Sequence, residues 1–345
     1  MCVTFLESEK QPADKLFYKD DHILFIKKHS DNKKFSFAFL GFESMKIEKY
    51  DVFKLKKENV IDLRNNKKTV LLFVPEGGFH LLVDFFNKIV NLCETDLNFE
   101  LILNFSADHV DGSRRGFDES FKVFLLKFLN DHGIGYTIID DWTDIDQIIV
   151  NDFIFFNKTC IESSPITHSL FLKYFSKYIN DINQKPFRKV YLNRKNYSER
   201  QEHDTTLSYN QDNRMQNEQI LQEYLFKNGV ECLSLENKFN TFEEQINYFY
   251  SVKILIAATS AGLTNCLYMQ PGSILVELVT PQLIEHNTSD GPSLGISINS
   301  LWQPITSVKE IDHISVSNLE RNAIAVLNKI KNTTYLQKVI EENYE

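Results

Sequence analysis

The chain has 345 residues, of which 43% are hydrophobic, and this length suits two domains of ordinary size. A net charge of −9 argues against a general affinity for nucleic acid or for an anionic membrane surface. The five cysteines lie far apart without a CxxC pair, which argues against a zinc site and against a disulfide framework.

The N-terminal segment has none of the features of a targeting sequence. It begins MCVTFLESEKQPADK, without a basic start followed by an apolar run, and no later stretch approaches 18 uninterrupted apolar residues. We therefore expect a cytoplasmic protein without an integral membrane segment. Residues 1–60 show weak periodicity and are expected to add short strands to the first domain.

From residue 69 onward, short apolar runs alternate with helical patterns. The predicted strands are TVLLFV (69–74), FELILNF (99–105), GYTII (135–139) and DQIIVNDFIFF (146–156). Helices are predicted over 79–94 and 117–130, where apolar residues recur at spacings of three and four. Such strands are typical of a parallel sheet that is buried on both faces.

A second series of the same kind follows residue 186. Its predicted strands are RKVYLN (188–193), VECLSL (230–235), KILIA (253–257) and SILVEL (273–278). Its predicted helices cover 214–228 and 242–251, and a closing helix or helix pair is expected over 318–343, after a capping box at Ser317 and Glu320.

Two βαβ series in tandem predict an α/β fold with two Rossmann-like lobes that face a central cleft, which is the GT-B architecture. We expect an N-terminal Rossmann-like lobe with an irregular extension over 1–182 and a C-terminal Rossmann-like lobe over 183–312. Helices in 313–345 are expected to pack across the lobes. Ligands are expected at the carboxyl ends of the strands.

In chain order, the first segment that carries candidate catalytic residues is EGGFHLLVD (76–84), where a glycine pair ends a strand and a helix begins. His80 and Asp84 share a face of this helix. Either one can serve as a general base beside an acceptor hydroxyl, or the two can form a buried hydrogen-bonded pair.

Two acidic or mixed segments in the first series have weaker signals. The polar loop DHVDGSRRGFD (108–118) is a candidate for the acceptor side. Asp144 and Asp146 form a DxD pair, but it precedes a strand, so we interpret it as a solvated turn and expect no metal site.

The basic segment KPFRKVYLNRKNYSER (185–200) contains six cations and one acid. Arg194 comes just after a predicted strand, where its guanidinium can bind a diphosphate, whereas a solvated basic surface is the alternative for its neighbours. Further on, RMQNE (214–218) begins a helix, and its Asn217 and Glu218 can equally form a polar first turn.

The loop AATSAGLTN (257–265) lies between a buried strand and a short helix that reaches Met269. Its small residues let the backbone approach a ligand, and free N–H groups at a helix start favour phosphate. The alternative is an ordinary turn in which Ser and Thr cap the helix.

Read together, these segments resemble glycosyltransferase family 61. The matching segments are Tyr191 to Arg194, Arg214 to Glu218, Glu244 with Gln245, Ser260 to Asn265, Pro271 with Gly272, and Val276 to Leu278. Phe79, His80 and Asp84 resemble the aromatic-His-x-x-x-acid segment of the family. The resemblance is specific over about 185–281 and loose over 70–180.

The chain departs from the family pattern at two places. The family loop often opens with His-Gly, but Thr259 and Ser260 stand here, so a contact made by that His is absent or is replaced by a hydroxyl. An insert at 196–213 lengthens the spacing after Arg194, and it leaves open whether Arg200 or Arg214 fills the second arginine role.

The resemblance implies an inverting hexosyl- or pentosyltransferase that uses a nucleotide-diphosphate sugar, with a UDP-sugar expected, and a carbohydrate or other hydroxyl acceptor. It also implies that the lobe over 1–182 is the acceptor lobe and that the lobe over 183–312 is the donor lobe. Arg194 with Arg214 or Lys195 would stabilise the diphosphate without metal or another cofactor, and Asp84 or His80 would be the base. The remaining donor residues implied are Asn217, Glu218, Thr259, Ser260, Ala261, Gly262, Leu263, Thr264, Asn265 and Glu277.

A second hypothesis is a catalytically degenerate GT-B protein that binds glycans or acts as a scaffold, and the altered Thr259 and Ser260 favour it. A nucleotide-dependent enzyme unrelated to sugars would need a phosphate fingerprint such as GxGxxG or GxxxxGK[ST]. Neither pattern occurs in the sequence.

Overall fold

The protein is described by a computed structural model, in which the described residues are 22–24, 60–62, 67–73, 85–104, 119–139, 147–149, 153–154, 166–193, 215–235, 238–279, 302–318, 320 and 322–342. The chain divides into two compact units, Met1–Ser164 and Pro165–Glu345. Among the described residues, no helix is long and apolar enough to cross a membrane.

The first unit contains a four-stranded parallel sheet with helices after two of its strands. Its strands are β3 (Lys68–Phe73), β4 (Phe99–Asn104), β5 (Gly135–Ile139) and β7 (Phe153–Ile154), in the order β5-β4-β3-β7. Helices α1 (Asn87–Cys93) and α2 (Glu119–Asp131) follow β3 and β4. The strands predicted over 69–74, 99–105 and 135–139 are therefore confirmed to within one residue at each end, and both predicted helices are present, with α1 beginning later than expected. The Phe86 ring between the helices contacts Phe121, Phe124 and Phe128.

The predicted strand over 146–156 is wrong as a single element. Its sequence forms β6 (Gln147–Ile149) and β7, which belong to different sheets. Strand β6 pairs with β1 (His22–Leu24) and β2 (Val60–Asp62) in a small mixed sheet. The polar pair Asn151 and Asp152 interrupts the apolar run, so each half can join a different partner.

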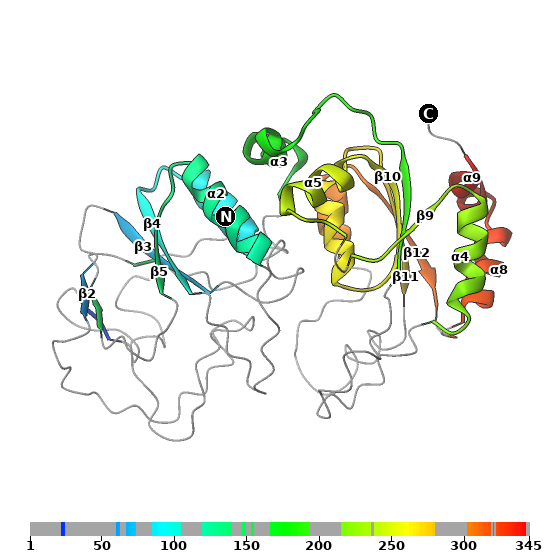
Figure 1. Ribbon diagram of the computed structural model, residues 1–345, viewed down its shortest axis with the longest axis horizontal. Helices are drawn as coiled ribbons and strands as arrows, with labels where there is room; N and C mark the ends of the chain where they lie inside the picture. Colours follow the sequence, from blue (N-terminus) through cyan, green and yellow to red (C-terminus); the bar gives the residue numbers. More distant parts are fainter. Residues whose placement is uncertain are drawn as a thin grey trace, which may run out of the picture. The chain divides into compact units, whose positions relative to one another are not determined.

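The second unit is built on a five-stranded parallel sheet (Figure 1). Its strands are β8 (Arg188–Leu192), β9 (Glu231–Leu233), β10 (Val252–Ala258), β11 (Ile274–Val279) and β12 (Asp312–Ser317), in the order β12-β11-β10-β8-β9. The first four confirm the prediction. In this order the direction of strand addition reverses between β8 and β10, and open α/β sheets bind ligands outside the carboxyl ends of the strands at such a point.

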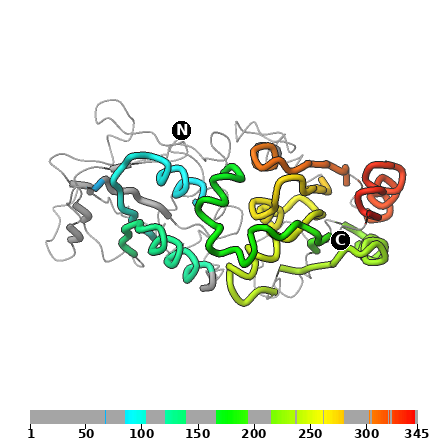
Figure 2. The backbone as a smooth tube through the Cα atoms, turned by 90° about the horizontal axis from the view of Figure 1, so that it is seen from above, coloured from blue at the N-terminus to red at the C-terminus, as the bar shows by residue number. Residues whose placement is uncertain are grey.

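Helices cover both faces of this sheet. One face packs on α4 (Glu218–Lys227), α8 (Ala323–Asn332) and α9 (Thr334–Glu341) through a continuous apolar core, and the view from above also places these helices together (Figure 2). The other face carries α5 (Phe242–Tyr250) and the 3₁₀ helix η7 (Ala261–Tyr268) (Figure 1). The sheet is thus buried on both sides, as a parallel sheet requires.

The helix α3 (His168–Phe175), with the short turn η4 (Ser176–Tyr178), belongs to the second unit. The ring of Phe171 contacts Tyr250 and Tyr268, so α3 packs within the second unit, which begins at Pro165, whereas the prediction grouped residues up to 182 with the first lobe. A last short helix, α7 (Gln303–Val308), precedes β12.

The C-terminal residues also differ from the expectation for 313–345. Residues 312–317 form an edge strand, and a helix pair follows it. This pair packs on the sheet of the second unit, and α8 is capped by the side chain of Asn322, which accepts from Ile324 N at 2.9 Å, rather than by the predicted Ser317 and Glu320.

Lys189 of the basic segment fixes the C-terminal helix pair to the sheet. Its side chain is buried, and its Nζ donates to the carbonyl oxygens of Asn228 at 2.5 Å, Ile340 at 2.8 Å and Glu342 at 3.2 Å. These carbonyls end α4 and α9, where the helix dipole favours a cation. Burial lowers the pKa of Lys189.

Replacing Lys189 with Met should therefore loosen both helix ends. Leaving buried carbonyls without a donor typically costs 1–3 kcal/mol, so we expect Lys189→Met to lower the free energy of unfolding by about 2 kcal/mol. Urea unfolding of the full chain measures the effect. Lys185→Met, which removes the same charge at an exposed position, is the matched control, and an equal loss in both variants would contradict the anchoring role.

Candidate functional site

The point at which the sheet of the second unit reverses its order brings two chain segments together at its carboxyl edge. Leu192, the last residue of β8, lies beside Ala257 of β10. The next residue, Asn193, donates its backbone N–H to Leu233 O at 2.9 Å. Its side-chain Oδ1 is buried and has no hydrogen-bond partner among the described residues. The edge therefore holds an acceptor that can be satisfied by a ligand.

The loop predicted to bind the donor starts where β10 ends. Ser260 has extended backbone, and its side chain makes no capping hydrogen bond within the described part of the chain, although it precedes η7. A Cβ on Gly262 would lie 3.3 Å from Leu192 Cδ1, so glycine lets the loop lie close to the end of β8. Leu263, Thr264 and Asn265 are buried, whereas Ser260 and Gly262 keep exposed surface.

Asn265 is held by two hydrogen bonds inside the protein. Its Nδ2 donates to Gly262 O at 2.8 Å, and its Oδ1 accepts from Gln245 Nε2 at 2.7 Å. Gln245 lies on α5, whose start is capped by Thr241, which accepts from Glu244 N at 3.2 Å. The side chain of Asn265 therefore shapes the loop and links it to α5.

Glu277 lies inside the sheet on β11 with none of its surface exposed. Its Oε1 accepts from Thr259 Oγ1 at 2.6 Å, and its Oε2 lies 3.0 Å from His313 Nε2. His313 belongs to β12, the neighbouring strand. The structure thus joins the predicted residues Thr259 and Glu277 and adds a histidine that the sequence did not single out.

A hydrogen bond between Tyr191 and Glu218 joins the two family motifs that precede this loop in the chain. The buried Tyr191 hydroxyl donates to Glu218 Oε1 at 2.5 Å, and burial together with this carboxylate raises the pKa of Tyr191 well above its usual range. Asn217, just before α4, is exposed and has φ of 57°, in the left-handed region that Asn tolerates. The start of α4 is thereby tied to β8.

Lys309 holds the other end of η7. It is fully buried, its Nζ donates to Leu267 O at 2.6 Å, and it lies 4.1 Å from the centre of the Phe171 ring. Burial lowers its pKa to about 7. Burial also lowers the pKa of His168 on α3 to about 4, with the charge of Lys309 adding to the effect. The same burial raises the pKa of the Cys266 thiol to about 12.

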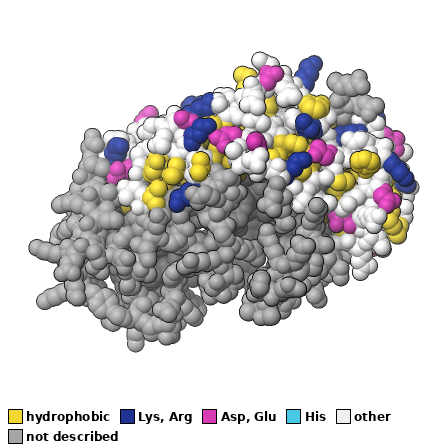
Figure 3. Space-filling view, in the orientation of Figure 1, with side chains coloured by type: hydrophobic (Ala, Val, Ile, Leu, Met, Phe, Trp, Pro, Cys, Tyr) yellow, Lys and Arg dark blue, Asp and Glu magenta, His cyan; other side chains and the backbone are white. Residues whose placement is uncertain are grey.

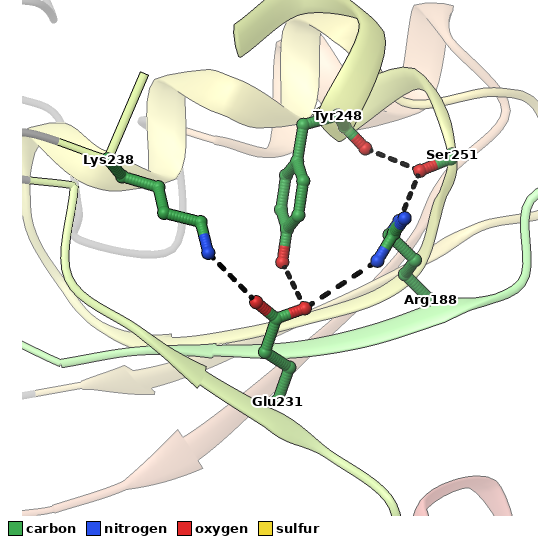
Figure 4. Close-up of polar contacts among 5 residues, drawn as sticks. All are labelled: Arg188, Glu231, Lys238, Tyr248 and Ser251. Atoms are coloured by element: carbon green, nitrogen blue, oxygen red, sulfur yellow. Dashed lines mark hydrogen bonds and ion pairs between the residues drawn. The ribbon is translucent and has the colours of Figure 1, made fainter. Parts of the chain in front are cut away.

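Arg188 of the basic segment lies at the amino end of β8, and Figure 4 shows its polar neighbours there. Its Nε donates to Ser251 Oγ at 3.0 Å, and its NH1 lies 3.7 Å from Glu231 Oε2. Glu231 also accepts from the Tyr248 hydroxyl at 2.7 Å and pairs with Lys238 at 3.4 Å. Arg188 therefore has neighbours that explain it without a ligand.

The surface drawn in Figure 3 shows how charges are distributed over its described residues. Lysine and arginine side chains lie interspersed with aspartate and glutamate there. Among the residues that the structure describes, no group of three or more His, Cys, Asp or Glu side chains could hold a metal ion.

Five predicted site residues lie outside the described residues, namely Asp84, His80, Arg194, Lys195 and Arg214. The sequence still places two of them: Arg194 directly follows Asn193, and His80 and Asp84 follow β3 in the chain. Sequence reasoning missed Asn193, His313 and Lys309. Only Asn193 carried a signal, because it lies within the segment from Tyr191 to Arg194.

The buried amine of Lys309 predicts a pH dependence of stability. Its pKa is about 7 in the folded chain and 10.5 ordinarily, so between these values the unfolded chain binds more protons. Stability should therefore rise with pH above about 7, with a slope of at most about 1.4 kcal/mol per pH unit from this group. We expect Lys309→Met to lack this slope.

Urea unfolding of the full chain between about pH 7 and pH 9 measures this difference. In a Trp142→Phe background, the buried Trp302 is the single tryptophan and reports on the second unit. Parallel pH profiles for the parent and the Lys309→Met variant would contradict the assignment.

The geometry can be compared with known proteins. A search among curated proteins found no match. The model of the family described as Glycosyltransferase 61 matches residues 79–276, which is more than half of the chain. The match covers the segment of His80 and Asp84, the carboxyl edge of β8 and the loop before η7. The chain belongs to glycosyltransferase family 61.

Proposed function

We propose that the protein is an inverting glycosyltransferase that moves a hexosyl or pentosyl group from a UDP-sugar to a hydroxyl of a glycan or similar acceptor. The acceptor oxygen attacks the anomeric carbon, a base takes the hydroxyl proton, and the bond from that carbon to the diphosphate oxygen breaks, releasing UDP. The observation that supports the donor site best is the reversal of strand order between β8 and β10.

The diphosphate needs hydrogen-bond donors and positive charge. Arg194, with Lys195 or Arg214, would supply the charge and stabilise the leaving group without metal. The Ser260 hydroxyl and the first backbone N–H groups of η7, at Ala261 and Gly262, would supply neutral donors at its N-terminus. These groups all follow the carboxyl ends of β8 and β10 in the chain.

Thr259 cannot donate to a phosphate while it donates to Glu277, because a hydroxyl has a single proton. Leu263, Thr264 and Asn265 are buried, which favours a supporting part for them. The same holds for Glu218, which accepts from Tyr191, whereas Asn217 is exposed at the start of α4. We assign the polar contact to the ribose or base to Asn193, because this residue keeps exposed surface at the carboxyl edge and its Oδ1 has no hydrogen-bond partner among the described residues.

The catalytic base is proposed to be Asp84 or His80. Both residues follow β3 in the chain. In the sheet of the first unit the strand order reverses between β3 and β7, as it does between β8 and β10 in the second unit, and ligands of open α/β sheets bind at such points. The family resemblance implies that the two units form a GT-B pair around a cleft. It also implies that the reaction needs no cofactor besides the sugar nucleotide. We further propose that the enzyme is cytoplasmic.

Arg194→Ala should abolish saturable binding of UDP-sugars. A thermal-shift screen of the full chain against nucleotide sugars identifies the donor, because a bound ligand raises the melting temperature in proportion to the logarithm of its saturation. We expect the shift given by the best donor to be lost in Arg194→Ala.

Arg188→Ala is the matched control, since Arg188 lies at the amino end of the same strand and its exposed ion pair contributes little to stability. This variant should keep the shift. Unchanged donor binding by Arg194→Ala would sink the assignment.

Asp84→Asn and His80→Gln separate catalysis from binding. Loss of a general base typically lowers the rate 10²- to 10⁴-fold, so we expect one of these variants to lose about that much transfer or donor hydrolysis while it still binds donor. Product formation is followed as released UDP. If neither the parent nor any variant turns over a donor that it binds, a degenerate glycan-binding or scaffold protein is the better explanation.

A further inference from the structure

The buried carboxylate of Glu277 links three adjacent strands. Thr259 follows β10, Glu277 lies on β11, and His313 lies on β12. A carboxylate only accepts hydrogen bonds, so the Thr259 hydroxyl and the His313 Nε2 must both donate to it. No surface of Glu277 is exposed, which leaves no path for a ribose hydroxyl to either oxygen.

Thr259 is fixed to β11 through its backbone as well. Its N–H donates to Leu278 O at 3.1 Å, next to the side-chain bond to Glu277. Ser260 follows immediately, and it is the first residue of the loop that keeps exposed surface. Thr259 is therefore the last residue whose backbone and side chain are both hydrogen-bonded to β11, and it sets the direction in which the loop leaves the sheet.

We propose that Glu277 and His313 are positioning residues for donor binding, which orient Thr259 through its hydroxyl proton and thereby set the geometry of the loop from Ser260 onward. This inference rests on the proposed function for its effect on the donor. It makes the effect of Glu277 on the donor indirect, and it assigns a positioning role to His313, which lies outside every motif of the sequence.

Donor affinity tests the chain of contacts. Thr259→Val removes the hydroxyl at nearly constant volume, and we expect it to weaken binding of the best UDP-sugar about tenfold, the effect of one lost hydrogen bond to a charged group. Thr259→Ser should recover most of this loss. His313→Leu, which removes the second donor, should weaken binding in the same direction, because it frees Glu277 to move.

The double variant Thr259→Val with His313→Leu separates a linked pair from two independent effects. If His313 acts through Glu277 on Thr259, the donor affinity of the double variant should be about the same as that of whichever single variant has the lower affinity. Losses that multiply in the double variant would contradict the link, and so would wild-type affinity in Thr259→Val.

Thr306→Val is the matched control for stability. Thr306 is also buried, and its hydroxyl donates to Trp302 O at 3.0 Å, so the same substitution there removes a buried hydrogen bond within α7 that does not involve Glu277 or Thr259. We expect Thr306→Val to lower the melting temperature without changing donor affinity. Equal affinity losses at both positions would show a general structural effect and overturn the proposal.

Hydrogen exchange of the full chain tests positioning without a donor. Thr259→Val and His313→Leu should each speed exchange in peptides covering 259–269, whereas peptides from α4 and α8 should stay unchanged. Absence of this local change would overturn the positioning role. If the parent chain bound no nucleotide sugar, the proposed function would fail, and the exchange result would still decide whether Glu277 and His313 hold the loop.

Discussion

The burial of Glu277 is the constraint on which the candidate site depends. A carboxylate taken out of water costs several kcal/mol unless hydrogen-bond donors replace its hydration. Thr259 and His313 provide these donors from the two strands beside it. Because Thr259 is the last residue held by the sheet, the same contact that makes the buried charge tolerable also determines where the loop begins.

The motifs that carry the family resemblance are bonded to one another. Tyr191 of the first motif donates to Glu218 of the second, and Gln245 of the helix motif donates to Asn265 of the loop. Thr259 completes the pattern by donating to Glu277 of the strand motif. Much of what looks like a set of ligand-binding residues in the sequence therefore acts as a frame.

This frame has two consequences for the chemistry. It commits the polar groups of Thr259, Asn265 and Glu277 to the protein, so the proposed donor contacts fall on Arg194, Ser260 and the start of η7. The frame also fixes the carboxyl edge, because Lys309 at the end of α7 and Gln245 on α5 both donate hydrogen bonds to η7. A preorganised edge is what electrostatic stabilisation of a diphosphate leaving group requires.

Most of the parallel strands of both units could be predicted, because buried runs of Val, Ile and Leu leave a strong local signal. The edge strand β12 could not, since only Ile314 and Val316 in DHISVS are apolar and an edge strand is half exposed. Lys189 and His313 illustrate a second limit. Their partners lie more than thirty residues away in the chain, so no local pattern predicts the contacts that these side chains make.

The central claim is that the donor binds at the carboxyl edge of the second unit, between β8 and β10. Photolabelling of the full chain with 5-azido-UDP-glucose, followed by mapping of the labelled peptides, tests it most directly. We predict labelling that free UDP suppresses, in peptides that contain Asn193 and Arg194 or residues 257–270. UDP-sensitive labelling confined to the first unit, or at the amino edge around Arg188, would contradict the account.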